Sequence, residues 1–208
     1  MRRLAIIAAL ALSACASTPP ANPQDAFWVN LSAHCGMAFP GTLTSDEAAD
    51  ADFKGRPLMM HVRSCTNSEI RIPFHVGPKE ADGKWDRSRT WVITRTTTGL
   101  RLKHDHRHED GSEDKLTQYG GDTATSGSAT AQSFPVDAES IALFRSEGRA
   151  ASVTNVWEVE ISDNGAANPR FAYVLRRTGE NARFFRVEFD LSTTVVAPPP
   201  WGPSARSR

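Results

Sequence analysis

Short runs of alternating apolar and polar residues fill much of the chain from residue 58 onward, and they constrain the fold more than any other feature. In the run 69–76, four apolar residues fall on one side, and Glu69, Arg71, Pro73 and His75 fall on the other. A repeat of two is typical of a strand with one buried face, and clusters of Gly, Asn, Pro and Ser between runs indicate turns. We predict strands at 58–65, 69–76, 90–96, 100–108, 115–119, 130–134, 152–161, 170–177 and 183–191.

Two segments with helical spacing accompany these runs. Residues 25–34 and 137–146 each carry apolar residues three or four apart, and Asp137 is suited to cap the second. Strands do not alternate with helices along the chain, so the sequence predicts a mainly β fold with two short helices. We expect an antiparallel meander that closes into a barrel-like domain of lipocalin-like size, with a sandwich as the alternative. Pro73 lacks a backbone N–H, which predicts an edge strand or a bulge at that point.

The N-terminus has the pattern of an export signal. Two arginines precede an apolar run that is far too short to span a bilayer. Leu12-Ser13-Ala14-Cys15 resembles the lipobox of bacterial lipoproteins, in which the chain is cut before the cysteine and the thiol carries a diacylglycerol. This resemblance implies a signal peptide at 1–14 and a stable membrane anchor at Cys15. Ala16 follows, where such lipoproteins of the inner membrane usually carry Asp, so we expect the periplasmic face of the outer membrane.

Composition divides the remainder into a tether, one domain and a tail. Residues 15–24 are polar and rich in proline, as in a flexible tether. Residues 25–194 are expected to form a single β-rich domain, followed by a Pro-rich tail at 195–208. Cys35 and Cys65 remain after lipidation, and in an oxidising compartment such a pair predicts a disulfide, with a catalytic thiol as the alternative.

The segment Gly99–Gly111 contains three of the six histidines in five positions. His104, His106 and His108 continue the apolar face of Leu100 and Leu102, so they are expected to point toward the end of the core. Alternate histidines would lie about 6.5 Å apart along a strand, a separation at which two imidazoles can converge on zinc, copper or nickel.

Three interpretations of these histidines remain open from the sequence. They form a hydrogen-bonded strand end, a ligand or metal site that includes Tyr119 and Asp122, or an acid–base site. The metal hypothesis names His104, His106 and His108 as ligands of a transition metal such as zinc.

The function expected from these features is binding of a small ligand or a metal by a membrane-anchored periplasmic lipoprotein. The alternatives are an envelope structural or interaction protein, and a hydrolase that uses the 104–108 cluster. No complete catalytic constellation is evident in the sequence, which favours a binding module over an enzyme. Lys and Arg number 24 and Asp and Glu number 24, a balance that argues against a nucleic-acid partner. The expected partners are the membrane, through the lipid, and a small ligand or an envelope protein.

Several blocks of the chain also resemble a family of uncharacterised secreted or lipoprotein-like bacterial proteins. These blocks are FWVNLSAHCGMAF, RIPFHVG, GLRLKHDHRHEDGSED with YGGDT, SVTNVWEVE and RFFRVEFDLS. The resemblance implies a single domain across the mature chain, and it implies no activity or cofactor.

Overall fold

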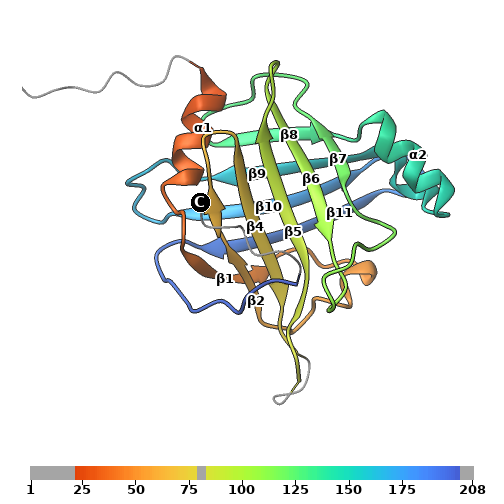
Figure 1. The fold of residues 1–208 in the computed structure, drawn as a ribbon, viewed down its shortest axis with the longest axis horizontal. Coiled ribbons are helices and arrows are strands. Elements are labelled where there is room, and N and C mark those ends of the chain that lie inside the picture. The colour runs from red at the N-terminus through yellow and green to blue at the C-terminus, as the bar shows by residue number, and fades with distance from the viewer. Residues whose placement is uncertain (1–21, 79–82, 202–208) are drawn as a thin grey trace, which may run out of the picture.

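The computed structural model describes residues 22–78 and 83–201, which form a barrel-shaped antiparallel sheet with two short α-helices (Figure 1). The strands are β1 (Ala38–Leu43), β2 (Leu58–His61), β3 (Ser64–Cys65), β4 (Glu69–Val76), β5 (Asp86–Arg95), β6 (Leu100–His106), β7 (Tyr119–Asp122), β8 (Ala131–Pro135), β9 (Asn155–Ile161), β10 (Arg170–Arg177) and β11 (Arg183–Asp190). The helices are α1 (Pro23–Ser32) and α2 (Ala138–Ser146), with 3₁₀ turns η1 (Ala48–Asp50) and η2 (Ala150–Thr154).

The strands follow one another around the barrel in chain order. The sheet runs β7-β6-β5-β4-β2-β1-β11-β10-β9-β8, with the short β3 paired to β4. The last strand, β11, therefore pairs with the first, β1, and the two ends of the sheet meet at β7 and β8. This is an up-and-down barrel, and it confirms the predicted mainly β, barrel-like fold with two short helices.

The seam between β7 and β8 is closed by a few backbone contacts. The amide of Asp137 donates to the carbonyl oxygen of Gly120 at 2.9 Å, and the Ser140 hydroxyl of α2 bonds to both backbone groups of Gly120. A Cβ at Gly121 would lie 1.7 Å from the carbonyl oxygen of Pro135. The backbones of β7 and β8 thus approach more closely than any side chain other than hydrogen permits.

Helix α1 closes one end of the barrel. Phe27, Trp28 and Leu31 are buried against the core, and Asn22 caps the helix by accepting from the amide of Gln24. Arg95, at the end of β5, pairs with Asp25 and lies 4.5 Å above the Trp28 ring. Because α1 contacts the late residues of β5, the early residues of that strand lie at the opposite end of the barrel, which we call the mouth. Helices α1 and α2 lie on opposite sides of the barrel (Figure 1).

The strand containing Pro73 lies inside the sheet, so the edge-strand prediction is wrong. β4 pairs with β5 on one side and with β2 and β3 on the other. The interruption between β2 and β3 falls opposite Ile72 and Pro73, where no ladder donor is needed. The predicted bulge is confirmed nearby, since the β4–β5 register shifts between Phe74 and Val76.

The strand predictions were wrong in three other places, one of them the start of the predicted strand 152–161, where residues 152–154 belong to η2. β1 was missed because it contains Pro40 and Gly41, which are unusual in strands. A Cβ at Gly41 would lie 2.5 Å from the Phe189 ring, so close packing explains the glycine. Residues 115–119 form a turn rather than a strand, with Gln118 at φ 57°, and only Tyr119 enters β7.

The disulfide between Cys35 and Cys65 is present, as predicted. It joins the chain just after α1 to β3, across a sequence separation of 30. On the chain-entropy model a loop of this size stabilises the fold by about 3–4 kcal/mol. Helix α1 begins at Pro23, two residues before the predicted start of the domain. The predicted signal peptide, Cys15 and residues 202–208 of the predicted tail lie outside the described residues.

Candidate functional site

Strand β6 directs two of the three clustered histidines into the barrel. His104 follows Leu100 and Leu102 on the inward face and is 3% exposed, and His106 is half-buried at the mouth. Their ring centroids lie 6.3 Å apart, close to the separation that strand geometry predicts. His108 lies beyond the end of β6 and is exposed, so it does not join them.

The hydrogen bonds of His104 define its tautomer. Nδ1 lies 3.0 Å from the carbonyl oxygen of Tyr119, which can only accept, so Nδ1 carries the proton. Nε2 lies 2.7 Å from the Tyr173 hydroxyl and accepts a hydrogen bond from it. Burial lowers the pKa of His104 to about 3, and it raises the pKa of Tyr173 well above its ordinary value. Both groups therefore remain neutral, and His104 holds the Tyr119 backbone and the Tyr173 ring in place.

His106 and Tyr119 form a second polar pair at the mouth. The Tyr119 hydroxyl lies 3.2 Å from His106 Nε2, and the Tyr119 ring stacks on His104 at 4.5 Å. Burial, followed by the charge of Arg89, lowers the pKa of His106 to about 4, and burial raises the pKa of Tyr119 to about 12. A neutral imidazole and a protonated phenol are groups that hydrogen-bond a ligand.

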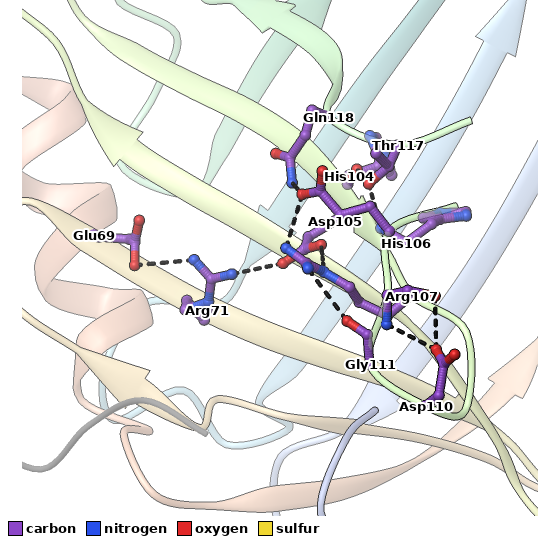
Figure 2. Close-up of polar contacts among 12 residues, drawn as sticks. Glu69, Arg71, His104, Asp105, His106, Arg107, Asp110, Gly111, Thr117 and Gln118 are labelled. Carbon is purple, nitrogen blue, oxygen red and sulfur yellow. Dashed lines mark hydrogen bonds and ion pairs between the residues drawn. The ribbon is translucent and has the colours of Figure 1, made fainter. Parts of the chain in front are cut away.

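Asp105 and Asp122, the second of which is predicted for the site, lie on the outer face of the barrel. Asp105 lies between Arg71 and Arg107, at 2.7 Å from each (Figure 2). Asp122 forms two hydrogen bonds with Arg101, at 2.6 and 2.9 Å, and both side chains are exposed. Of the residues predicted for the site, the structure thus brings together His104, His106 and Tyr119 and separates His108 and Asp122 from them.

A cavity of about 130 Å³ opens at the mouth beside these residues. We call it the mouth cavity, and it is lined by Phe53, Phe74, Arg89, Trp91, His104, His106, Tyr119, Tyr173, Leu175, Arg183 and Phe185. Trp91 stacks on Tyr173 at 4.3 Å and on Phe74 at 4.9 Å, so one wall is a continuous row of aromatic rings. The cavity offers flat apolar walls with a few polar groups, which is the usual composition of a small-molecule site.

A second cavity, of about 340 Å³, adjoins the first. It shares His106, Tyr119, Tyr173 and Leu175 with the mouth cavity and extends toward η2 and the end of β10. Arg177 lines it and donates to Asn155 at 2.9 Å and to Ser152 at 3.2 Å. A hollow of about 640 Å³ elsewhere lies on the outer face of β9–β11, where Arg186 already pairs with Glu160 and Glu188.

The barrel does not bring together the three histidines that were predicted as metal ligands, because His108 lies beyond the end of β6. Among residues 22–78 and 83–201, no group of three or more His, Cys, Asp or Glu side chains is arranged to hold a metal ion. At the mouth, Nε2 of His104 and Nε2 of His106 are both engaged by tyrosine hydroxyls.

Sequence reasoning missed Tyr173, Arg89 and Arg183 as members of the site, although strand parity indicates each of them. Tyr173 shares the inward face of β10 with the buried Phe171, two positions earlier. Arg89 has the same parity as Trp91 in β5, and Arg183 the same parity as Phe185 in β11. Charged residues at the inward positions of strand ends are therefore the signal that could have located the site.

A third buried histidine lies outside the lining of the mouth cavity. His75 of β4 is 0% exposed, and neither ring nitrogen has a hydrogen-bond partner among the described residues. Burial, reinforced by the charges of His61, Arg87 and Arg63 and opposed by Asp86, lowers the pKa of His75 to about 4. His75 therefore affects the stability of the fold, and it takes no part in the site.

Comparisons with known proteins identify neither a family nor a relative of this chain. Within the described part of the chain, each helix is too short or too polar to cross a bilayer. Comparison with protein-family models, with curated proteins and with solved structures found no match to the chain.

Proposed function

We propose that this chain is a lipid-anchored periplasmic lipoprotein of the outer membrane that binds a small ring-containing molecule in the mouth cavity. The observation that carries the proposal is the cavity itself, which has largely aromatic walls and opens at one end of the barrel. Its volume of about 130 Å³ is close to that of engineered apolar cavities, about 150 Å³, that bind benzene. A ligand with a single planar ring would fit between the aromatic walls of the mouth cavity.

The polar groups of the cavity support binding rather than catalysis. General bases work best with a pKa near the operating pH, and the lowered pKa values of His104 and His106 make both imidazoles weak bases. Tyr119, with its raised pKa, remains a protonated phenol. His106 and Tyr119 can orient a ligand by hydrogen bonding without changing charge, while both ring nitrogens of His104 are engaged by Tyr119 and Tyr173.

Calorimetric titration with benzamide, a neutral compound with one ring, tests the proposal. We expect saturable binding to the wild type. Leu175 lines both cavities, so Leu175→Trp should fill the mouth and weaken binding by at least about tenfold. Arg176→Trp is the matched control, because Arg176 is the next residue of β10 and lies exposed on the outer face.

Equal binding to Leu175→Trp and the wild type would place benzamide outside the mouth and overturn the proposed site. The absence of binding to the wild type would contradict a site for one-ring molecules. Binding to the Arg176→Trp variant should match the wild type.

The anchor is tested separately in the full-length chain. Cys15→Ser removes the thiol that would carry the lipid, so the variant should move from the membrane fraction to the soluble periplasmic fraction. Immunoblots of the two fractions, alongside the wild type, measure this. Retention of the Cys15→Ser variant in membranes would contradict the lipoprotein assignment and leave the ligand site unaffected.

A further inference from the structure

The charged residues that line the mouth cavity are of one sign, although the whole chain is neutral. Two arginines, Arg89 and Arg183, and no carboxylate of the described residues line it. Their ion-pair partners are Asp86 and Asp50, and neither of these carboxylates lines the mouth cavity. Two further arginines and one carboxylate, Asp114, line the adjoining cavity. The positive side chains, rather than their acidic partners, therefore border the mouth cavity.

Arg183 has an unsatisfied donor at this site. Its Nη2 donates to Asp50 at 2.7 Å, and Asp50 is fully buried, so the guanidinium is fixed in position. Its Nη1 is buried and has no hydrogen-bond partner among the described residues. Nη1 lies 3.8 Å from a carboxylate oxygen of Glu47. This distance allows an electrostatic attraction but is too long for a hydrogen bond. A buried charged N–H without a partner costs free energy, which a ligand oxygen would recover if a small movement of the Arg183 side chain exposed Nη1 to the cavity.

Two other arginines lie nearby, Arg89 in the lining of the mouth cavity and Arg177 in that of the adjoining cavity. Arg89 pairs with Asp86 and lies 5.7 Å above the Phe53 ring. Arg177 makes hydrogen bonds only to the neutral side chains of Asn155 and Ser152. Burial and the charge of Arg183 lower the pKa of Arg177 below its usual range, so a nearby anion would relieve that repulsion.

We propose that the ligand of the mouth cavity is an aromatic carboxylate, with its ring against Trp91 and its carboxylate on Arg183. This inference rests on the proposed function, because it specifies the ligand of the same cavity. A planar carboxylate matches the planar guanidinium, and the charge-assisted hydrogen bond is stronger than one to a neutral oxygen. The Tyr119 hydroxyl lies at the same wall, and it can donate to the ligand when His106 Nε2 carries a proton and donates to the hydroxyl oxygen.

Three compounds of the same shape and different charge test the inference by calorimetry on the wild-type domain. Benzoate is an anion, benzamide is neutral and benzamidine is a cation. We expect benzoate to bind about tenfold or more tightly than benzamide, and benzamidine to bind more weakly than both. Raising the salt concentration should reduce the preference for benzoate only partly, because the site is buried.

The variant Arg183→Lys tests whether Arg183 causes the preference for benzoate over benzamide. Lysine keeps a positive charge for Asp50 and loses the planar pair of donors, so the preference for benzoate over benzamide should fall by about tenfold. Arg176→Lys on the outer face is the matched control and should leave the ratio unchanged. If Arg183→Lys fails to fold, the wild-type ratio among the three compounds decides the inference alone.

The outcomes separate this inference from the function on which it rests. Equal binding of benzoate and benzamide, both abolished in Leu175→Trp, would overturn the carboxylate inference and support the ring-binding function. Failure of all three compounds to bind would overturn both. A benzoate preference that persists in Arg183→Lys would overturn the role of Arg183.

Discussion

Gly121→Ala is expected to lower the free energy of unfolding by about 4 kcal/mol, among the largest effects of a single substitution. The added Cβ would lie 1.7 Å from the Pro135 carbonyl oxygen, and the three nearest atoms all belong to the backbone, which cannot rotate away as a side chain does. The seam between β7 and β8 must then part, which strains the hydrogen bond from Asp137 to Gly120. Urea unfolding followed by tryptophan fluorescence measures the change.

Gly55→Ala is the control for this substitution. Gly55 has φ +68° and no atom within 4 Å of an added Cβ, so it reports backbone strain without a clash. We expect a loss of about 1–2 kcal/mol there. Equal losses for the two variants would show that the seam tolerates the added atom and would contradict the tight closure described above.

Acidification is expected to destabilise the barrel strongly between about pH 7 and pH 5. His75, His104 and His106 have folded-state pKa values of about 4, 3 and 4, against 6.5 for the unconstrained side chain. The unfolded chain therefore takes up protons below pH 6.5, while the folded chain takes them up only near pH 3–4. Stability is fully present above pH 6.5 and falls as the pH decreases toward the folded values.

The size of this loss in the free energy of unfolding follows from the number of buried histidines. Each contributes up to about 1.4 kcal/mol per pH unit, so the three together remove about 5 kcal/mol between pH 7 and pH 5. Asp86, Asp137 and Glu160 have lowered pKa values, so their stabilisation is lost only at lower pH. Urea unfolding at a series of pH values measures the slope.

His75→Leu isolates one of the three contributions. The substitution removes two buried nitrogens without partners, so the variant should gain about 1 kcal/mol at pH 7. Its loss of stability on acidification should be about one third smaller than in the wild type. His108→Ala, at an exposed position, is the matched control. A free energy of unfolding that stays constant from pH 7 to pH 5 would contradict the prediction.

Strand periodicity predicted most of the barrel because its inward and outward faces differ sharply in polarity. β4, β10 and the end of β9 lie where the alternation places them. β1 could not be recognised in this way, since its Pro40 and Gly41 are explained only by the neighbours they pack against, Phe189 among them. Pro73 was misassigned for the same reason, because the break in the adjacent strands that accommodates it is visible only after folding.

The sequence predicted only part of the site, because some of its residues meet only in the folded barrel. The alternation of strand residues correctly predicted that His104 and His106 point inward. It does not apply to His108, because β6 ends at His106. Proximity in the sequence suggested Asp122, yet β7 carries it to the other end of the strand from Tyr119 and turns it outward to Arg101. Tyr173 and Arg183 come from strands far away in the chain, so only the closed barrel brings them to the histidines.

The position of α1 determines which way the barrel would face on a membrane. If Cys15 carries the lipid, only six residues separate it from the helix cap at Asn22, a span of at most about 25 Å when fully extended. The plugged end of the barrel is then held close to the bilayer, and the mouth points away from it. Ligand would enter and leave from the aqueous compartment without passing through the lipid layer.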